Sequence, residues 1–432
     1  MRRVVAIVDG EHYPPVVRAA LEEIDDLVVA AVLVGGTEKL RGDGVLDGYG
    51  VPLEPSVEEA IGRHQPDVVL DLSDEPVLGP PERMALASRV LALGVPYEGS
   101  DFRFDPPPAT VVDVPTLAVI GTGKRVGKTA VTGHVARLLA STRRTVVVAM
   151  GRGGPPDPEV VVVRPTVETL LELSRAGRHA ASDHLETAVV AGVTTVGCRR
   201  CGGGLAGAVA VSNVVEGVGA ATGLGAELVV LDGSGAALPP VAADRRVLVA
   251  SAGQPVAVTA GYLNAFRARI ADLVVVTMAE DDAPHTALRD ALRAHTRPWT
   301  PIVRTVLRPR PLEPVDGARV AFFCTAAAER HARLAEELER VHGARVTSVS
   351  GNLSDRARLR EDVAAADADV FLVELKAAAV DVVVEEANRR GVRVVVAAND
   401  VVPLPGEQQL DEALERLAAE AVALVPEPVR TR

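Results

Sequence analysis

The stretch VIGTGKRVGKTAV, residues 119–131, restricts the possible folds of this chain more than any other segment. An apolar run, TLAVIG, comes directly before the glycines, and KTAVTGHVARLL follows them with its apolar residues at helical spacing. A buried strand that enters a glycine-rich turn and continues as a helix directs backbone N–H groups towards a phosphate at the helix N-terminus. The sequence therefore predicts a phosphate-binding loop inside an α/β domain.

The strict form of such a loop, G-x-x-x-x-G-K-[ST], requires glycine at position 122, where this chain has threonine. The segment nevertheless keeps small residues in a slightly shifted arrangement, so we interpret it as a variant loop. The alternative is a glycine-rich turn in which Gly-Lys-Thr occurs by coincidence. The form G-T-x-x-x-V-G-K-T resembles the loop of dethiobiotin synthetase and related ATP-dependent synthetases. The residues predicted to bind nucleotide phosphates are Gly121, Thr122, Gly123, Lys124, Arg125, Val126, Gly127, Lys128 and Thr129.

A phosphate-binding loop is usually accompanied by an acidic residue at the end of a neighbouring strand, which helps to order Mg²⁺. The segment AELVVLDGSGAALPP, residues 226–240, contains Asp232 directly after an apolar run. It resembles a segment of the same synthetases that has glutamate at this position. We predict that Thr129 and Asp232 hold Mg²⁺; the alternative is a strand-end aspartate that caps a turn.

Short valine-rich runs alternate with helical patterns along the whole chain, which is typical of α/β proteins with mainly parallel sheets. Proline-rich segments near 104–115 and 308–314 divide this pattern into three parts. We predict three-layer parallel-sheet domains: a Rossmann-like substrate-binding domain at 1–112, a central P-loop NTPase domain at 113–312 that binds ATP, and a Rossmann-like α/β domain at 313–432.

Charge and lysine usage restrict the possible partners. The net charge of -12 argues against a nucleic-acid-binding protein, because a phosphate backbone requires a basic face. Only four of the 46 basic residues are lysines, so Lys39, Lys124, Lys128 and Lys376 are candidates for roles that arginine cannot fill. No apolar run reaches the length of a membrane span, and the apolar residues before Asp9 are too few for a secretory segment, so we expect a cytoplasmic protein.

Basic residues in two further segments are candidates for anion binding. Arg152 stands between glycines after the run VVVAMG, at the strand end where open α/β sheets bind ligands. The segment TTVGCRRCGGGLAG combines Arg199 and Arg200 with Gly202 and Gly203. Guanidinium groups beside a run of glycine N–H groups are typical of an anion nest.

Cys198 and Cys201 form a C-x-x-C pair, which suggests zinc. A closed zinc site needs four ligands, and no second C-x-x-C or Cys/His pair stands nearby. We therefore do not predict a metal site within one subunit, whereas a site shared between two subunits stays open. Three cysteines in total imply no disulfide framework.

Two other strand ends carry candidate ligands. Asp9, Glu11 and His12 follow the first strand, and Lys39 follows the second; both are crevice positions in an open sheet. Lys376 follows a buried strand in the third predicted domain. We predict that the first four contact substrate and that Lys376 contacts phosphate or acts in catalysis; ordinary polar turns are the alternative.

Six segments together resemble the cyclic 2,3-diphosphoglycerate synthetase family: DGEHYPPVV, GGTEK, GTGKRVGKTAVTGH, MGRGGPP, GCRRCGGGLAG and DGSGAALPPV. The resemblance covers most of the chain and implies an ATP- and Mg²⁺-dependent ligase, acting as a homodimer, that activates one phosphate of 2,3-diphosphoglycerate. The other phosphate would then attack intramolecularly and give a cyclic phosphoanhydride, ADP and phosphate. This family is associated with thermophilic methanogens, whose composition the arginine-rich, lysine-poor chain does not share.

The resemblance also assigns roles to residues. Catalysis would depend on Lys128, Lys124, Arg152, Arg199, Arg200 and Lys376. The small-molecule substrate would be held by Asp9, Glu11, His12, Lys39, Arg152, Arg199, Arg200, Gly202 and Gly203.

Two alternative functions stay open. One is a simple ATP-dependent kinase of a phosphoglycerate-like acid, which needs the same donor site. The other is a nucleotide-switched metallochaperone or positioning ATPase, in which Cys198 and Cys201 deliver metal. The absence of an N-K-x-D motif favours ATP over GTP.

Overall fold

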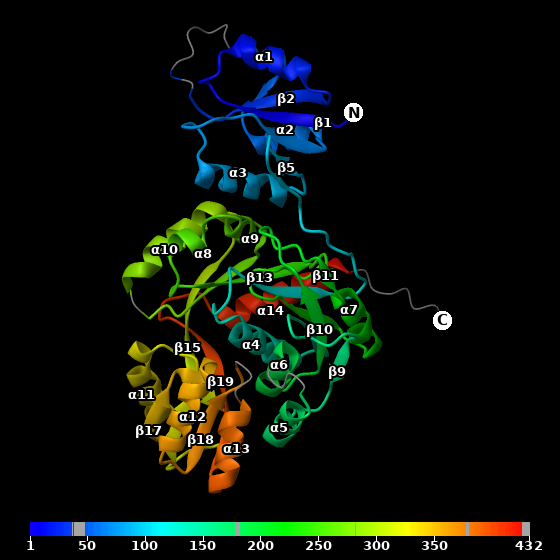
Figure 1. Cartoon of the computed structure of the whole chain (residues 1–432). Helices are drawn as coiled ribbons and strands as arrows, with labels where there is room; N and C mark the ends of the chain where they lie inside the picture. Colours follow the sequence, from blue (N-terminus) through cyan, green and yellow to red (C-terminus); the bar gives the residue numbers. More distant parts are fainter. Residues whose placement is uncertain (37, 39–47, 178–181, 281, 377–379, 426–432) are drawn as a thin grey trace, which may run out of the picture.

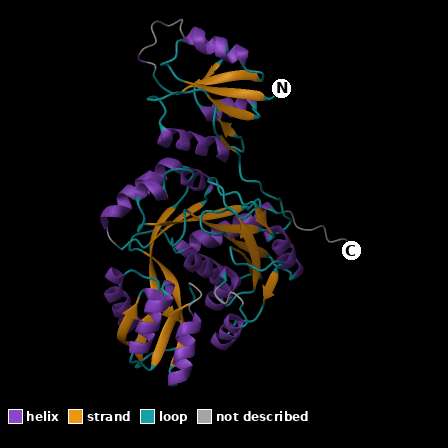
Figure 2. Cartoon of the chain, in the orientation of Figure 1, coloured by secondary structure: helices purple, strands orange, loops and turns teal. Residues whose placement is uncertain are grey.

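The structure, a computed structural model, describes the chain except for residues 37, 39–47, 178–181, 281, 377–379 and 426–432. Its strands form two sheets, one of six and one of 13 strands, and most strand pairs are parallel. Helices cover these sheets (Figures 1 and 2). The predicted α/β class is therefore confirmed.

The N-terminal domain contains the smaller sheet, in the order β3-β2-β1-β4-β5-β6. Its strands are β1 (Arg3–Val8), β2 (Leu27–Leu33), β3 (Leu53–Glu54), β4 (Val68–Asp71), β5 (Tyr97–Glu98) and β6 (Arg103–Phe104). Its helices are α1 (Pro14–Glu23), α2 (Val57–His64) and α3 (Pro80–Ala92). The strand order reverses between β1 and β4, so their carboxyl ends border the crevice where open α/β sheets bind ligands.

The larger sheet has the order β11-β10-β8-β12-β7-β13-β14-β15-β19-β18-β16-β17, with β9 paired to β10. The P-loop domain contributes the strands β7 (Thr116–Gly121), β8 (Thr145–Gly151), β9 (Glu159–Val161), β10 (Thr195–Cys201), β11 (Val211–Ser212), β12 (Leu228–Asp232), β13 (Arg245–Ser251), β14 (Leu273–Thr277) and β15 (Ile302–Pro311). Its helices are α4 (Lys128–Ala140), α5 (Val167–Arg175), α6 (Asp183–Ala191), α7 (Val214–Gly223), α8 (Val256–Thr259), α9 (Asn264–Ile270) and α10 (Asp282–His295).

The C-terminal lobe, defined here as residues 313–409, completes the same sheet. It consists of β16 (Arg319–Phe323), η3 (Ala328–Arg330), α11 (His331–His342), β17 (Arg345–Ser350), η4 (Asn352–Ser354), α12 (Arg356–Ala365), β18 (Val370–Glu374), α13 (Val380–Arg390) and β19 (Arg393–Pro403). A last helix, α14 (Leu410–Leu424), follows it.

Strand β15 connects the P-loop domain to the C-terminal lobe. It runs parallel to β14 from Ile302 and then antiparallel to β19 as far as Pro311. The proline-rich segment that we expected to mark a domain boundary is therefore partly a strand, and no break in the sheet separates the two units. The prolines are tolerated because an antiparallel ladder leaves every second residue without a ladder hydrogen bond.

Helix α14 returns to the P-loop domain after the C-terminal lobe is complete. Its Leu410, Leu414 and Leu417 pack in one buried cluster with Val131 of α4 and Leu117 of β7. Burial of a leucine side chain contributes about 1.5–3 kcal/mol to folding stability. Helix α14 therefore forms a substantial part of the core of the P-loop domain.

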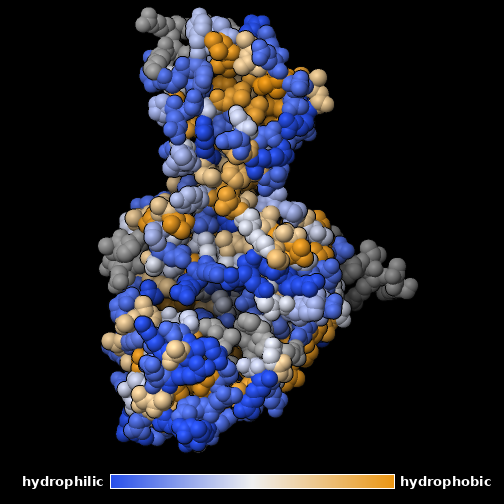
Figure 3. Space-filling model, viewed as in Figure 1, coloured by the Kyte–Doolittle hydropathy of each residue, from blue (hydrophilic) through white to orange (hydrophobic). Residues whose placement is uncertain are grey.

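The N-terminal domain docks on the P-loop domain through α3 and α9, and a narrower waist separates the two (Figure 3). Phe266 and Leu263 of the P-loop domain enter the hydrophobic core of the N-terminal domain. Arg269 bridges the interface at 2.8 Å from Glu58. The interface is thus apolar in its centre and has an ion pair beside it.

Candidate active site

Strand β7 leads directly into the predicted phosphate-binding loop, and α4 leaves it. Gly127 has φ +80°, a left-handed conformation that favours glycine, and directly precedes Lys128 at the start of α4. The first N–H groups of a helix have no partners within the helix, so they are available to an anion. A Cβ atom at Gly121 would lie 3.0 Å from the carbonyl oxygen of Gly235, so this position also requires a very small residue.

Thr122 fits the loop although the strict motif has glycine there. Its φ is not positive, its N–H donates to Val249 O at 3.1 Å, and its carbonyl accepts from Asn264 Nδ2 at 3.0 Å. The left-handed turn is made by Arg125, with φ 59°, as well as by Gly127. The loop is therefore a well-formed variant at this position.

Neighbouring strands hold the rest of the loop in place. Gln254 Nε2, after β13, donates to Lys124 O at 3.0 Å. Thr277 Oγ1, at the end of β14, donates to Val126 O at 2.8 Å. These two hydrogen bonds hold the loop through its carbonyl oxygens. They do not use the loop N–H groups.

Asp232 ends β12, which lies directly beside β7 in the sheet. Lys128 Nζ donates to Asp232 Oδ1, and Thr132 Oγ1 donates to the same oxygen at 2.8 Å. The carboxylate thus neutralises the Lys128 ammonium. A buried carboxylate and the hydroxyl of Thr129 in the first turn of α4 are hard oxygen donors of the kind that Mg²⁺ prefers. The donor set therefore fits the metal that the sequence predicts.

Arg200 reaches the segment that follows Asp232. Its guanidinium donates to Ser234 O at 3.1 Å and to Gly202 O at 2.7 Å. Burial lowers the pKa of Arg200, and the positive charge of nearby Arg152 lowers it further. Two of the predicted anion-binding arginines are thus close enough to repel each other beside the phosphate-binding loop.

Arg199 and the glycines have different positions. Arg199 is exposed and precedes Arg200 in β10, so its side chain points to the opposite face of the strand. Gly202 has φ +75°, and a Cβ atom at Gly203 would lie 3.4 Å from Arg200 Nη1. The glycine run therefore lies around Arg200 and not around Arg199.

The cysteine pair does not form a chelating pair within the chain. Cys198 is buried, and a Cβ atom at Gly217 would collide with its Sγ. Cys201 is exposed. Burial raises the pKa of the Cys198 thiol to about 12, which keeps it protonated. Among the described residues, no group of three or more His, Cys, Asp or Glu side chains is arranged to hold a metal ion.

The crevice of the N-terminal domain contains Asp9, Glu11 and His12. Asp9 is buried; its Oδ1 accepts hydrogen bonds from Glu11 N at 3.0 Å and His12 N at 3.2 Å, and its Oδ2 accepts one from Asp74 N at 2.7 Å. Burial alone would raise the pKa of Asp9, but the bonds from Asp74 and His12 lower it below its usual value. Both carboxylate oxygens are thus used within the domain. Lys39 lies outside the described residues.

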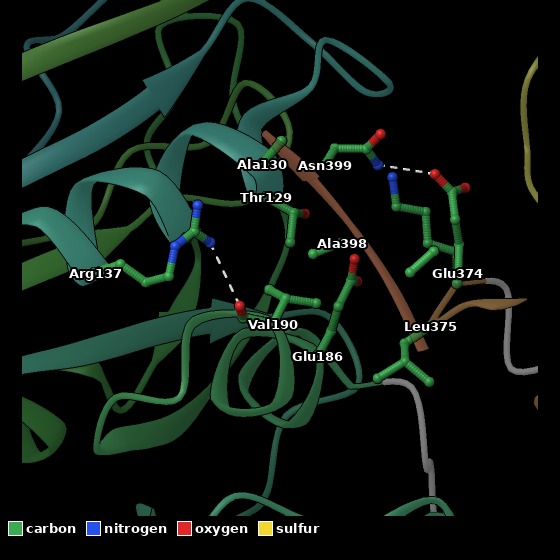
Figure 4. A pocket seen from close by; sticks show the side chains of 12 residues that line it. Thr129, Ala130, Arg137, Glu186, Val190, Glu374, Leu375, Ala398 and Asn399 are labelled. Atoms are coloured by element: carbon green, nitrogen blue, oxygen red, sulfur yellow. Dashed lines mark hydrogen bonds between the residues drawn. The ribbon is translucent and has the colours of Figure 1, made fainter. Parts of the chain in front are cut away.

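A narrow cleft separates the phosphate-binding helix from the C-terminal lobe (Figure 4). Its polar lining includes Thr129, Glu186, Glu374, Lys376 and Asn399. The pKa of Glu186 is raised to about 8, first by burial and then by the carboxylates of Asp183, Glu374 and Asp232, against the opposing effect of Lys376. The carboxylate of Glu374 raises the pKa of Lys376 although burial lowers it. Lys376 thus lines the same cleft as Thr129 of α4.

Sequence reasoning missed Glu186 and Glu374. Glu374 accepts from Asn399 Nδ2 at 2.9 Å and from Thr325 Oγ1 at 3.1 Å. Glu186 lies on α6 next to Leu185 and one turn before Val189 and Val190. An acidic residue in the middle of such a buried apolar helix was the available signal.

Within the part of the chain that the structure describes, no helix is both long and apolar enough to span a membrane.

Family models and the sequences of known proteins both match this chain along nearly its whole length. Family models of cyclic 2,3-diphosphoglycerate synthetase match residues 3–105 (N-terminal domain), 116–296 (P-loop domain) and 311–400 (C-terminal domain). The chain is 50% identical over 438 residues to the cyclic 2,3-diphosphoglycerate synthetase of Rubrobacter xylanophilus, covering 97% of this chain and 98% of that one. It is 40% identical over 452 residues to the enzyme of the same name from Methanothermobacter thermautotrophicus, covering 97% and 96%. Among solved structures, LpxK from Aquifex aeolicus in complex with ATP aligns with a TM-score of 0.42 and 13% identity, covering 72% of this chain and 91% of that one.

Proposed function

The chain belongs to the cyclic 2,3-diphosphoglycerate synthetase family, and we propose that it is an ATP-dependent ligase that closes the intramolecular phosphoanhydride of 2,3-diphosphoglycerate. One observation carries the proposal: the phosphate-binding loop, the Lys128–Asp232 pair, Arg200 and Arg152, which directly follows β8 beside β10, all lie at the carboxyl edge of one sheet. Such a site offers donors and cations where phosphoryl transfer needs them.

The reaction has two displacement steps. In the first, a phosphate oxygen of 2,3-diphosphoglycerate attacks the γ-phosphorus of ATP; a P–O–P bond forms and ADP leaves. In the second, an oxygen of the other phosphate attacks the activated phosphorus, and inorganic phosphate leaves as the ring closes. A phosphate monoester is mostly dianionic near neutral pH, so neither step needs a general base to generate the nucleophile.

The main obstacle is repulsion between two highly charged anions. Loop N–H groups and Lys128 would bind the nucleotide phosphates, with Lys124 beside them, while Arg152 and Arg200 would orient the diphosphoglycerate. Lys376 would approach from the C-terminal lobe. Thr129 and Asp232 would hold Mg²⁺, which supplies further positive charge at the phosphates. His12 and Glu11 stay as proposed substrate contacts, whereas Arg199, on the face of β10 opposite Arg200, would contribute little. A homodimer stays a prediction that sedimentation would check.

Phosphorus NMR of the purified protein with ATP, Mg²⁺ and 2,3-diphosphoglycerate tests the reaction. We expect two coupled anhydride resonances from the cyclic product, together with ADP and inorganic phosphate, and their loss in Lys128→Ala. ADP with a new linear phosphorylated acid would identify a kinase instead. Absence of turnover with 2,3-diphosphoglycerate despite nucleotide binding would refute the substrate assignment.

A further inference from the structure

Arg330 links the C-terminal lobe to the P-loop domain. It is the last residue of η3 and leads into α11. A Cβ atom at Gly253, in the turn after β13, would lie 3.1 Å from Arg330 Nη2. The missing side chain of Gly253 therefore lets a guanidinium from the other lobe lie against the backbone of the P-loop domain.

This turn belongs to the support of the phosphate-binding loop. The next residue, Gln254, donates to Lys124 O, and its Oε1 would lie 3.9 Å from a Cβ atom at Gly123. Arg330 thus lies against the residue that precedes Gln254, whose side chain holds the loop backbone at Lys124. It approaches on the β13 side, whereas Asp232 lies on the opposite side of β7.

Neighbouring arginines have partners that Arg330 lacks. Arg308 pairs with Glu280 at 2.9 Å, and Arg340 pairs with Glu337 at 2.9 Å. The guanidinium of Arg330 is half-buried, yet among the described residues it meets no carboxylate and no hydrogen-bond acceptor. A guanidinium carries five N–H donors, and no nitrogen of Arg330 is among the buried polar atoms without a partner, so these donors face solvent and are open to a ligand. A ligand with several acceptor oxygens would satisfy them.

We propose that Arg330 is a phosphate-binding residue that the C-terminal lobe supplies to the nucleotide held by the P-loop, an assignment that rests on the ATP-dependent function proposed above. Its planar guanidinium donates to phosphate oxygens of the bound nucleoside triphosphate. Lys128 already faces the Asp232 carboxylate, so an additional cation increases the stabilisation of charge that develops during transfer. Through this contact, both the P-loop domain and the C-terminal lobe contribute residues to one active site.

The test combines nucleotide binding with turnover. Arg330→Ala is expected to weaken calorimetric binding of a non-hydrolysable ATP analogue roughly tenfold or more, without changing adenosine binding, and to lower kcat about 100-fold. Arg330→Lys should stay folded but not recover kcat, because an ammonium lacks the planar fork. Guanidinium ion added to the Arg330→Ala variant should restore part of the lost rate. Arg340→Ala, a change on the adjoining helix α11 at a side chain 65% exposed, should match the wild type.

Three outcomes separate the possibilities. If Arg330→Ala and Arg330→Lys bind the analogue and turn over as Arg340→Ala does, the assignment is wrong. Equal weakening of adenosine and analogue binding would place Arg330 near the adenosine part of the nucleotide. The proposed contact with phosphate would then be wrong. If the wild type makes no cyclic product while Arg330→Ala still weakens analogue binding selectively, the proposed reaction fails and the role of Arg330 is supported.

Discussion

The N-terminal crevice around Asp9 and the phosphate-binding edge, which comprises the loop 121–129 with Asp232 and Arg200, both lie at carboxyl ends of parallel strands. They use charged residues differently. In the crevice, Asp9 accepts hydrogen bonds from three backbone N–H groups of its own domain, and its Oδ1 lies 2.9 Å from Nδ1 of the neighbouring His12 ring. Beside the phosphate-binding loop, Lys128 at the start of α4 pairs with Asp232 at the end of β12, and Arg200 of β10 reaches the segment that follows Asp232. The first arrangement stabilises two turns, whereas the second gathers charges from distant parts of the chain.

This difference gives a criterion for choosing among candidate sites. A charged group whose hydrogen bonds all go to neighbouring residues has a structural role, because it satisfies donors that would otherwise be buried without partners. Opposite charges brought together from separate elements have desolvation costs that ligand binding can offset. The following predictions test this contrast, from the largest expected effect to the smallest.

Removal of the central cation should have the largest effect. Lys128→Ala is expected to lower kcat by roughly 1000-fold or more, since loss of a preorganised charge at transferring phosphate is among the costliest changes in such sites. ADP release, followed by a coupled assay, measures it. A matched Lys124→Ala change at the neighbouring loop position should cost less, and equal effects would contradict the assigned central role of Lys128.

The two neighbouring arginines of β10 should differ. Arg200→Ala is expected to raise KM for 2,3-diphosphoglycerate by about 10- to 100-fold, because a charge-assisted hydrogen bond to substrate is lost. Arg199→Ala should change KM by less than about threefold, since the side chain lies on the opposite face of the strand. Initial-rate kinetics decide, and a larger effect at Arg199 would reverse the proposed orientation of the substrate.

Asp9→Asn should affect stability more than activity. Its amide nitrogen cannot accept the bonds that one carboxylate oxygen accepts, so we expect a loss of roughly 1–3 kcal/mol in the free energy of unfolding. Calorimetry measures the fall in Tm, and kcat should stay within about twofold of the wild type. His12→Ala tests the crevice as a substrate site: an unchanged Tm with a raised KM would assign substrate binding to this domain as well.

Glu186 should make stability fall as pH rises. Its folded-state pKa of about 8 lies above the ordinary glutamate value of 4.5, so the folded protein binds more protons than the unfolded chain between these two pH values. Its favourable contribution is complete below pH 4.5 and is lost as the pH rises towards 8. The glutamine of Glu186→Gln cannot titrate. The difference in Tm between this variant and the wild type should therefore shift in favour of the variant by a few degrees as the pH is raised from 5 to 8.5. A constant difference across this range would contradict the raised pKa.

The cysteines should have the smallest effect. Cys201→Ser is expected to leave kcat, KM and Tm unchanged within error, because the exposed thiol lies apart from the buried Cys198. Zinc titration by calorimetry of the wild type and this variant should give no difference. Metal binding that disappears in the variant would revive the metallochaperone alternative.

The local parts of the fold were predictable from sequence, because a strand, a glycine turn and a helix follow one another within a few residues. The Thr116–Gly121 strand and the Lys128–Ala140 helix both occur where TLAVIG and KTAVTGHVARLL indicate them. The position of Asp232 next to the loop was also predictable, since parallel strands align their carboxyl ends.

Contacts between distant segments were not predictable in this way. The prolines of residues 308–314 indicate a linker, yet β15 pairs there with β19, about 90 residues later in the chain. Arg330 has no local motif and becomes noticeable only where η3 meets the turn after β13, and for Glu186 the sequence offers only its position within an apolar helix. Pairing over such separations depends on the packing of the whole sheet and leaves no short-range periodicity.

The return of α14 to the P-loop domain has a consequence for protein synthesis. Leu410, Leu414 and Leu417 fill the core around α4, so the nucleotide domain cannot complete its interior until the ribosome has released residues 410–424. The N-terminal domain has its own hydrophobic clusters and emerges first, so it can fold early. A transcript that stops after β19 would therefore produce a chain whose phosphate-binding half retains an exposed apolar face and becomes a substrate for chaperones and proteases.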